Sequence, residues 1–122
     1  MTQEKELLLK DLCARLPYGV FISYDNGDEI ETKEMGIASL HDFMFNNAEV
    51  KPYLRPMSSM TEEEYHEFHQ QIYKGTPYSD GASYNIYEVT GLNCDWLNKK
   101  MFDYRGLIPM GLALEASEEM YK

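Results

Sequence analysis

The chain has 122 residues, of which 43% are hydrophobic and 26% charged, a composition typical of one globular domain and too apolar for a disordered chain. Its 21 acidic and 11 basic residues give a formal net charge of −10 at pH 7, which repels nucleic-acid phosphates and anionic lipid headgroups. We therefore expect a single domain, residues 1–122, that binds neither nucleic acid nor a membrane directly.

The cysteines and the N-terminal segment indicate a reducing compartment. Cys13 and Cys94 are the only cysteines, too few for the disulfide framework of a small secreted domain. Residues 1–6 are polar and are followed by only three consecutive leucines, so the pattern predicts neither a signal peptide nor a membrane span. We expect a cytoplasmic protein, in which Cys13 is a buried free thiol.

The first expected element is a helix over residues 3–16, because apolar side chains recur there at helical spacing. This stripe consists of Leu8, Leu9, Leu12, Cys13 and Leu16. Asp11 lies away from this stripe. Thr2 is placed to cap the helix, and Pro17 ends it because proline cannot donate to a helical hydrogen-bond ladder.

A β-hairpin is expected next. Residues 19–24 are rich in β-formers, and the Asp-Asn-Gly-Asp sequence at 25–28 supplies the residues of a tight turn. The returning strand, 29–35, is highly charged, so one of its faces should be wet or the strand should lie at a sheet edge. Residues 40–45 are interpreted as a third strand, with a short helix as the alternative.

Two prolines in residues 50–57 favour an extended connection between the sheet and the next helix. That helix is predicted over residues 62–73, because Thr61 and Glu64 have the spacing of a capping box. Its buried stripe is expected to consist of Tyr65, Phe68 and Ile72.

The last third of the chain is expected to contain a surface loop at 74–83, a strand at 84–90 and a short helix capped by Asn93 or Asp95. Together these elements predict an α+β fold. A small antiparallel sheet of three or four strands, which a strong bend could bring close to a barrel, is packed by two amphipathic helices and by short C-terminal helices.

Candidate chemistry centres on two histidines. His66 and His69 are three residues apart on the second helix, where two side chains can reach one metal ion. No further ligand stands at a recognised spacing, so we interpret them as structural and predict no metal or other cofactor. Cys94 could act as a nucleophile only beside a base that the sequence does not identify. The sequence therefore assigns no catalytic residue.

Five segments together resemble a family of short uncharacterised proteins encoded by gut anaerobes and by their phage-like elements. These segments are residues 12–20, 50–64, 95–98, 102–108 and 111–116. The longest contains both prolines of the extended connection and the capping box. This resemblance covers most of the chain in order, but it implies no activity and assigns no binding residues.

Three hypotheses for function follow. The first is a non-enzymatic protein-interaction or accessory protein of a mobile element that binds a protein partner through exposed tyrosines; the candidates are Tyr53, Tyr78, Tyr84 and Tyr87. The second is an acidic mimic of nucleic acid, which requires the carboxylates of residues 25–34 to form one stripe with those of 62–67. The third is a metal-binding or enzymatic module at His66, His69 and Cys94.

Overall fold

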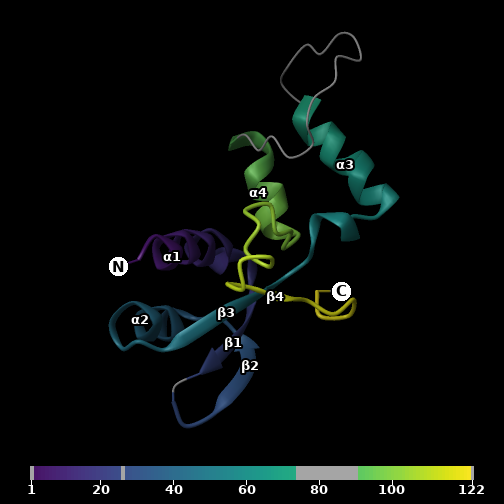
Figure 1. Cartoon of the computed structure of the whole chain (residues 1–122). Coiled ribbons are helices and arrows are strands. Elements are labelled where there is room, and N and C mark those ends of the chain that lie inside the picture. Colours follow the sequence, from purple (N-terminus) through teal and green to yellow (C-terminus); the bar gives the residue numbers. More distant parts are fainter. Residues whose placement is uncertain (1, 26, 74–90, 122) are drawn as a thin grey trace.

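The computed structural model describes residues 2–25, 27–73 and 91–121, and the side chains of 69–73 and 91–94 lie outside this description. A four-stranded mixed sheet with helices confirms the predicted α+β class (Figure 1). No helix within the described ranges is long and apolar enough to cross a bilayer. The helices are α1 (Gln3–Arg15), α2 (Ile37–Phe45), α3 (Glu62–Tyr73) and α4 (Gly91–Lys99), with 3-10 turns at Leu16–Tyr18 and Met57–Ser59. The strands are β1 (Phe21–Asp25), β2 (Ile30–Glu34), β3 (Glu49–Leu54) and β4 (Leu114–Glu115), in the order β2-β1-β3-β4.

The predicted hairpin is confirmed. β1 and β2 pair antiparallel, with Phe21 opposite Glu34 and Asp25 opposite Ile30. In the turn, the Asp25 carboxylate accepts a hydrogen bond from the backbone N–H of Gly27 at 2.9 Å, and Gly27 has a φ of 100° that favours glycine. β2 is an edge strand with four of its five residues exposed, as its charge predicts.

The expected extended connection at 50–57 is instead largely the central strand β3. β3 pairs antiparallel with β1 and parallel with β4. Every second residue, Val50, Pro52 and Leu54, is buried, so the period-two pattern fits the sheet despite the prolines. Pro52 is the last residue paired with β1, and β4 pairs only with the two residues that follow it. Proline has no backbone N–H to donate. Pro52 therefore lies at the position where the pairing of β3 with β1 ends and its pairing with β4 begins.

Residues 40–45 belong to helix α2, so the strand prediction is wrong and its helical alternative is correct. Leu40, Phe43 and Met44 all pack into the sheet core, a spacing that a helix can place on one face. Asp42 fixes the helix to the sheet because its carboxylate accepts a hydrogen bond from the Tyr24 hydroxyl at 2.6 Å. This bond lowers the pKa of Asp42 and raises that of Tyr24.

Helix α1 begins as predicted, with the Thr2 hydroxyl accepting a hydrogen bond from the N–H of Lys5 at 3.1 Å. Its buried face differs from the prediction. Asp11 and Arg15 are fully buried beside the leucines, and Cys13 is exposed. The prediction of a buried Cys13 thiol is therefore wrong, because the helix turns its charged pair inward to meet partners from the C-terminal third of the chain.

The described core has two clusters. The larger joins α1 and α2 to the sheet, and the smaller surrounds Trp96. In the smaller one, the Trp96 ring lies 5.5 Å from Phe68 and 5.8 Å from Phe102, and its N–H donates to Glu67 at 2.9 Å. Helix α3 therefore packs on α4, whereas we expected it to cover the sheet (Figure 1).

Helix α4 starts at Gly91, earlier than predicted. Asn93 and Asp95, which were predicted to cap this helix, therefore lie inside it.

The capping box of α3 is confirmed. The N–H of Glu64 donates to the Thr61 hydroxyl at 3.1 Å, and the N–H of Thr61 donates to the Glu64 carboxylate at 3.0 Å. Phe68 is buried as predicted, whereas Tyr65 is exposed. The third residue of the expected stripe, Ile72, lies outside the described side chains, as do the whole of the predicted loop at 74–83 and the predicted strand at 84–90.

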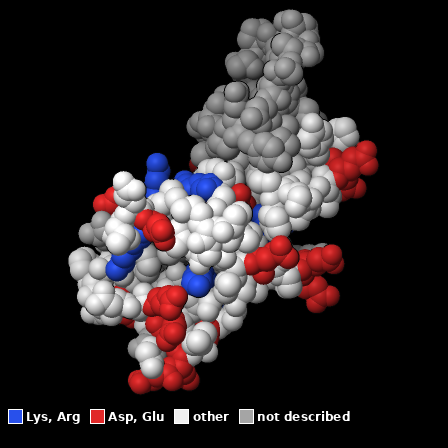
Figure 2. All heavy atoms as spheres, viewed as in Figure 1, with Lys and Arg blue, Asp and Glu red and all other residues white. Residues whose placement is uncertain are grey.

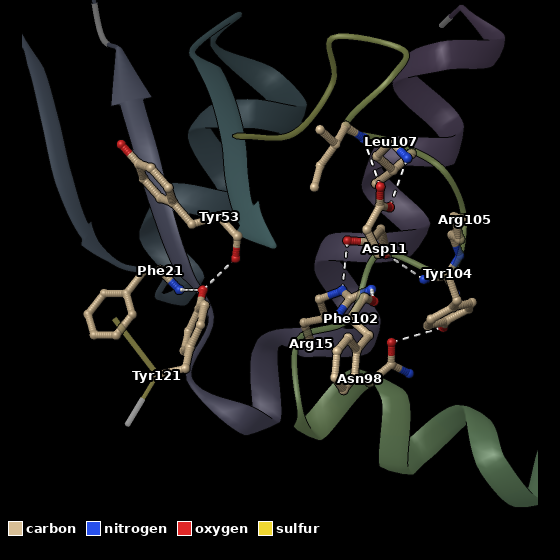
Figure 3. A network of polar contacts seen from close by, with 12 residues as sticks. Asp11, Arg15, Phe21, Tyr53, Asn98, Phe102, Tyr104, Arg105, Leu107 and Tyr121 are labelled. Carbon is tan, nitrogen blue, oxygen red and sulfur yellow. Dashed lines mark hydrogen bonds and ion pairs between the residues drawn. The ribbon is translucent and has the colours of Figure 1, made fainter. Parts of the chain in front are cut away.

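A tyrosine near the C-terminus bridges two strands. The Tyr121 hydroxyl accepts a hydrogen bond from the N–H of Phe21 in β1 at 2.9 Å and donates one to the carbonyl of Tyr53 in β3 at 2.7 Å (Figure 3). This bridge lies one residue beyond the last β1–β3 pair, Ile22 and Pro52. Burial raises the pKa of Tyr121 to about 12, so the hydroxyl keeps its proton and the bridge at neutral pH.

We expect Tyr121→Phe to lower the free energy of unfolding by about 1–2 kcal/mol, because it leaves the backbone groups of Phe21 and Tyr53 without their partner. Urea denaturation followed by circular dichroism measures the change. Tyr18→Phe is the matched control, since that ring is exposed, and it should alter stability by less than about 0.5 kcal/mol. Equal effects of the two variants would contradict the structural role of the bridge.

Candidate interaction surface

Of the candidate residues for metal binding or chemistry, the structure describes the side chain of His66 alone. His66 is exposed on α3, with its ring 6.4 Å from that of Tyr65. The side chains of His69 and Cys94 lie outside the described residues. Among the side chains that are described, no group of three histidines, cysteines or carboxylates is arranged to hold a metal ion.

Of the four tyrosines predicted as contact residues, the structure describes Tyr53 alone; Tyr78, Tyr84 and Tyr87 lie outside the described ranges. Tyr53 is half-buried on β3, and its hydroxyl lies 3.3 Å from that of Thr32 on β2. Its carbonyl accepts the Tyr121 bridge. The hydroxyl and the carbonyl of Tyr53 are therefore both engaged within the sheet region.

A buried polar network links α1 to the segment after α4 (Figure 3). One oxygen of the Asp11 carboxylate accepts from Nε of Arg15 at 2.9 Å, and the other accepts from Nη1 of Arg105 at 2.6 Å. Arg15 also donates from Nη2 to the Phe102 carbonyl at 2.6 Å. Asp11 and Arg15 are fully buried and bind groups of the chain itself, so their arrangement serves the fold.

The neighbouring residues extend this network. The carboxylate of Asp103 accepts from the backbone N–H groups of Leu107 and Ile108, at 2.8 and 2.9 Å. The Tyr104 hydroxyl donates to the Asn98 side chain at 2.9 Å, and the Arg105 guanidinium lies 4.5 Å from the Tyr104 ring. These contacts fix the path of residues 98–108 without exposing a reactive group.

A cavity of about 630 Å³ lies between the β3–α3 connection and the C-terminal segment. In its wall, the Arg55 guanidinium makes two hydrogen bonds to the Glu64 carboxylate, at 2.7 and 2.6 Å. These bonds hold the pKa of Glu64 at about 2. Glu64 is therefore ionised at neutral pH and has no proton to give as a general acid.

A second hollow, of about 290 Å³, lies between the start of α1 and the turn that joins α2 to β3. Its lining contains both signs of charge, with Glu4 and Lys5 on one side and Glu49 and Lys51 on the other. This balance favours neither an anion nor a cation.

The clearest anomaly of the described surface is the outer face of α2. Ile37 and Phe45 have exposed fractions of 76% and 67%. His41 lies between them, with its ring centroid 4.9 Å from that of Phe45. Because these residues are four apart along the helix, they form one line of side chains. We call Ile37, His41 and Phe45 the α2 ridge.

Sequence reasoning missed this ridge because it read residues 40–45 as a strand. A strand places Phe43 and Phe45 on one face, whereas the helix buries Phe43 and leaves Phe45 exposed. The signal was present in the sequence, since a helix over 37–45 has large apolar side chains on both faces. One face is enough to pack against the sheet, so the other needs a separate explanation.

The carboxylates do not form the continuous stripe that nucleic-acid mimicry requires on the face shown in Figure 2. They gather in separate groups over α1, the hairpin, the C-terminal segment and the start of α3. The hairpin and α3 lie at opposite ends of the molecule (Figure 1).

Comparison of the chain with protein-family models, with curated proteins and with solved structures finds no match in any of the three.

We expect Asp11→Asn to lower the free energy of unfolding by about 3–5 kcal/mol, because it leaves the buried Arg15 without its charged partner. Urea denaturation measures the loss. Glu6→Gln changes an exposed carboxylate of the same helix and should cost less than about 1 kcal/mol. If Asp11→Asn lowers the free energy of unfolding by less than about 1 kcal/mol, the buried network does not stabilise the fold as proposed.

The Arg55–Glu64 pair predicts a specific acid dependence. The folded pKa of Glu64 is about 2, against an ordinary value of 4.5. The ionised Glu64 carboxylate therefore stabilises the folded state fully above about pH 4.5, and this stabilisation is lost as the pH falls towards 2. We expect a double-mutant cycle of Arg55→Met and Glu64→Gln to show coupling at pH 7 that declines over this interval. Equal coupling energies between Arg55 and Glu64 at pH 7 and pH 2 would contradict an ion pair that depends on the ionised Glu64 carboxylate.

Proposed function

We propose that this protein is a non-enzymatic interaction protein, and that the α2 ridge is its docking surface for a protein partner. The observation that carries the proposal is the exposure of two large apolar side chains, Ile37 and Phe45, along one line of one helix. Exposed apolar groups of this kind mark interaction sites when they are clustered. The buried network and the Arg55–Glu64 pair offer weaker support for an enzyme, because their charged groups are bound within the chain.

The ridge is held in place before any partner arrives. Phe43 is buried on the opposite face of α2, and the bond between Asp42 and Tyr24 connects the helix to β1. A preorganised surface loses little conformational entropy on binding. Burying an Ile or a Phe side chain contributes about 1.5–3 kcal/mol, so Ile37 and Phe45 together could supply much of the binding energy.

Site-specific photocrosslinking tests the proposal. The photoreactive amino acid p-benzoylphenylalanine replaces Ile37 or Phe45 in one pair of variants, expressed in cells of the source organism. Ile30 and Met110 are the matched control positions, because both are exposed apolar residues outside the ridge. We expect a discrete crosslinked protein from the ridge positions, identified by mass spectrometry, and at least about fivefold less of it from the controls.

Serine substitution of Phe45 provides a competition control. Because the ring is exposed, Phe45→Ser should change stability by less than about 0.5 kcal/mol and should reduce crosslinking from position 37. Equal crosslinking from ridge and control positions, or no discrete product from either ridge position, would overturn the proposed function.

A further inference from the structure

We infer that a second copy of the chain pairs with the open edge of the sheet, β2 against β2, in an antiparallel two-fold arrangement centred on Thr32. This interface uses the hairpin and none of the residues of the α2 ridge, so it goes beyond the proposed function and does not depend on it. The inference follows from the direction of the β2 backbone groups and from the order of charges along the strand.

β2 has one open side. It is the outermost strand in the order β2-β1-β3-β4, and β1 is the one strand that pairs with it among the described residues. The hairpin lies at one end of the molecule (Figure 1). An edge strand offers its outward N–H and C=O groups to a strand of another chain, which adds to the sheet by backbone hydrogen bonds.

The register within the hairpin shows which groups of β2 point outward. The N–H of Met35 donates to the carbonyl of Val20 at 2.9 Å, and these two residues continue the β1–β2 register. Hydrogen-bonded and non-hydrogen-bonded pairs alternate in an antiparallel ladder. Every second residue before Met35 therefore also bonds to β1, and the residues between them direct their backbone groups away from β1. These outward residues are Ile30, Thr32 and Glu34.

A second β2 can use all three outward residues. With Thr32 of one copy opposite Thr32 of the other, Ile30 lies opposite Glu34 of the other copy. Each of these is then a hydrogen-bonded pair, in which two residues exchange both N–H···O bonds. A shift of the register by one residue would place the outward groups opposite groups that already bond to β1. The ladder itself therefore excludes that shift.

The charges of β2 select the same register. The Lys33 ammonium lies 3.2 Å from the Glu31 carboxylate and 4.2 Å from the centre of the Tyr24 ring, and the two charged side chains are 38% and 51% exposed. In the two-fold arrangement, Glu31 of each copy lies opposite Lys33 of the other. These are non-hydrogen-bonded pairs, in which cross-strand side chains approach most closely. The four charges therefore alternate in sign.

Other registers that keep the ladder place like charges together. A shift by two residues puts Glu31 opposite Glu31 in one direction and Lys33 opposite Lys33 in the other, and both are unfavourable. Charged edge strands discourage pairing with most strands, but this order of charges accepts a second copy in one register. The net charge of −10 opposes association at long range, although salt screens it beyond about 8 Å at physiological ionic strength.

Sedimentation velocity of the full chain tests the inference, at chain concentrations from about 10 µM to about 1 mM in about 0.15 M salt. We expect a monomer–dimer equilibrium. Thr32→Pro removes the central outward N–H, which the pairing with β1 does not use, and should weaken association about tenfold or more. Thr32→Val keeps this N–H and the β-branched shape, and should change association less than about twofold. Circular dichroism checks that both variants fold.

An exchange of charges tests the register. Glu31→Lys and Lys33→Glu each place like charges opposite one another in a homodimer and should weaken association about tenfold or more. An equimolar mixture of the two variants should recover it, because both cross-strand pairs then have opposite charges. The double variant Glu31→Lys/Lys33→Glu should associate like the unchanged chain, and it provides the same test if either single variant folds poorly.

Three results would overturn the inference: a chain that stays monomeric up to about 1 mM, a dimer that Thr32→Pro leaves unchanged, or a charge exchange that restores nothing. A dimer that Ile37→Ser/Phe45→Ser dissociates, while Thr32→Pro has no effect, would place the second copy on the ridge instead. Photocrosslinking from position 30 is expected to give a product of twice the chain mass, which differs from the partner captured by the ridge.

Discussion

The shared carboxylate of Asp11 is the constraint on which the arrangement of the described elements depends. A charge in the protein interior loses its hydration, and this loss is offset only when the surrounding groups replace it. Asp11 uses both oxygens, one for Arg15 of its own helix and one for Arg105, 94 residues later. Because both partners are charged, α1 and the segment after α4 must meet in one geometry. The position of α1 over the sheet is thereby coupled to the C-terminal third of the chain.

Phe102 transmits this constraint to the second hydrophobic cluster. Its carbonyl accepts the Arg15 bond, and its ring packs beside Trp96 under α3 and α4. On its other side, Phe102 forms a bridge with Arg55, just beyond β3, and the Arg55 guanidinium lies 4.2 Å from the Phe102 ring. Arg55 in turn holds Glu64 at the start of α3. One residue thus contacts elements of both clusters, so that the sheet and the α3–α4 pair are linked by side chains as well as by the chain.

The sequence predicted those features whose partners are close along the chain. The box of Thr61 and Glu64 was correctly predicted because both members lie within one helical turn. The burial of Asp11 was not predicted, since it depends on Arg105, far away in the sequence, and an isolated carboxylate on a helix is normally exposed. The error at Cys13 has the same origin, because turning Asp11 inward turns the thiol outward. The candidate site was missed for a different reason, which lies in α2 itself.

α2 has more apolar surface than its fold requires. Its inner face, with Phe43, packs against the sheet, and this face alone is enough to position the helix. Ile37 and Phe45 on the outer face contribute little to that packing, so selection for stability does not explain them. A segment that is apolar on two faces gives no single periodicity, which is why its secondary structure was ambiguous from the sequence. Places where sequence patterns conflict with the fold are often functional. The same feature that obscured α2 therefore argues that its outer face is kept for binding.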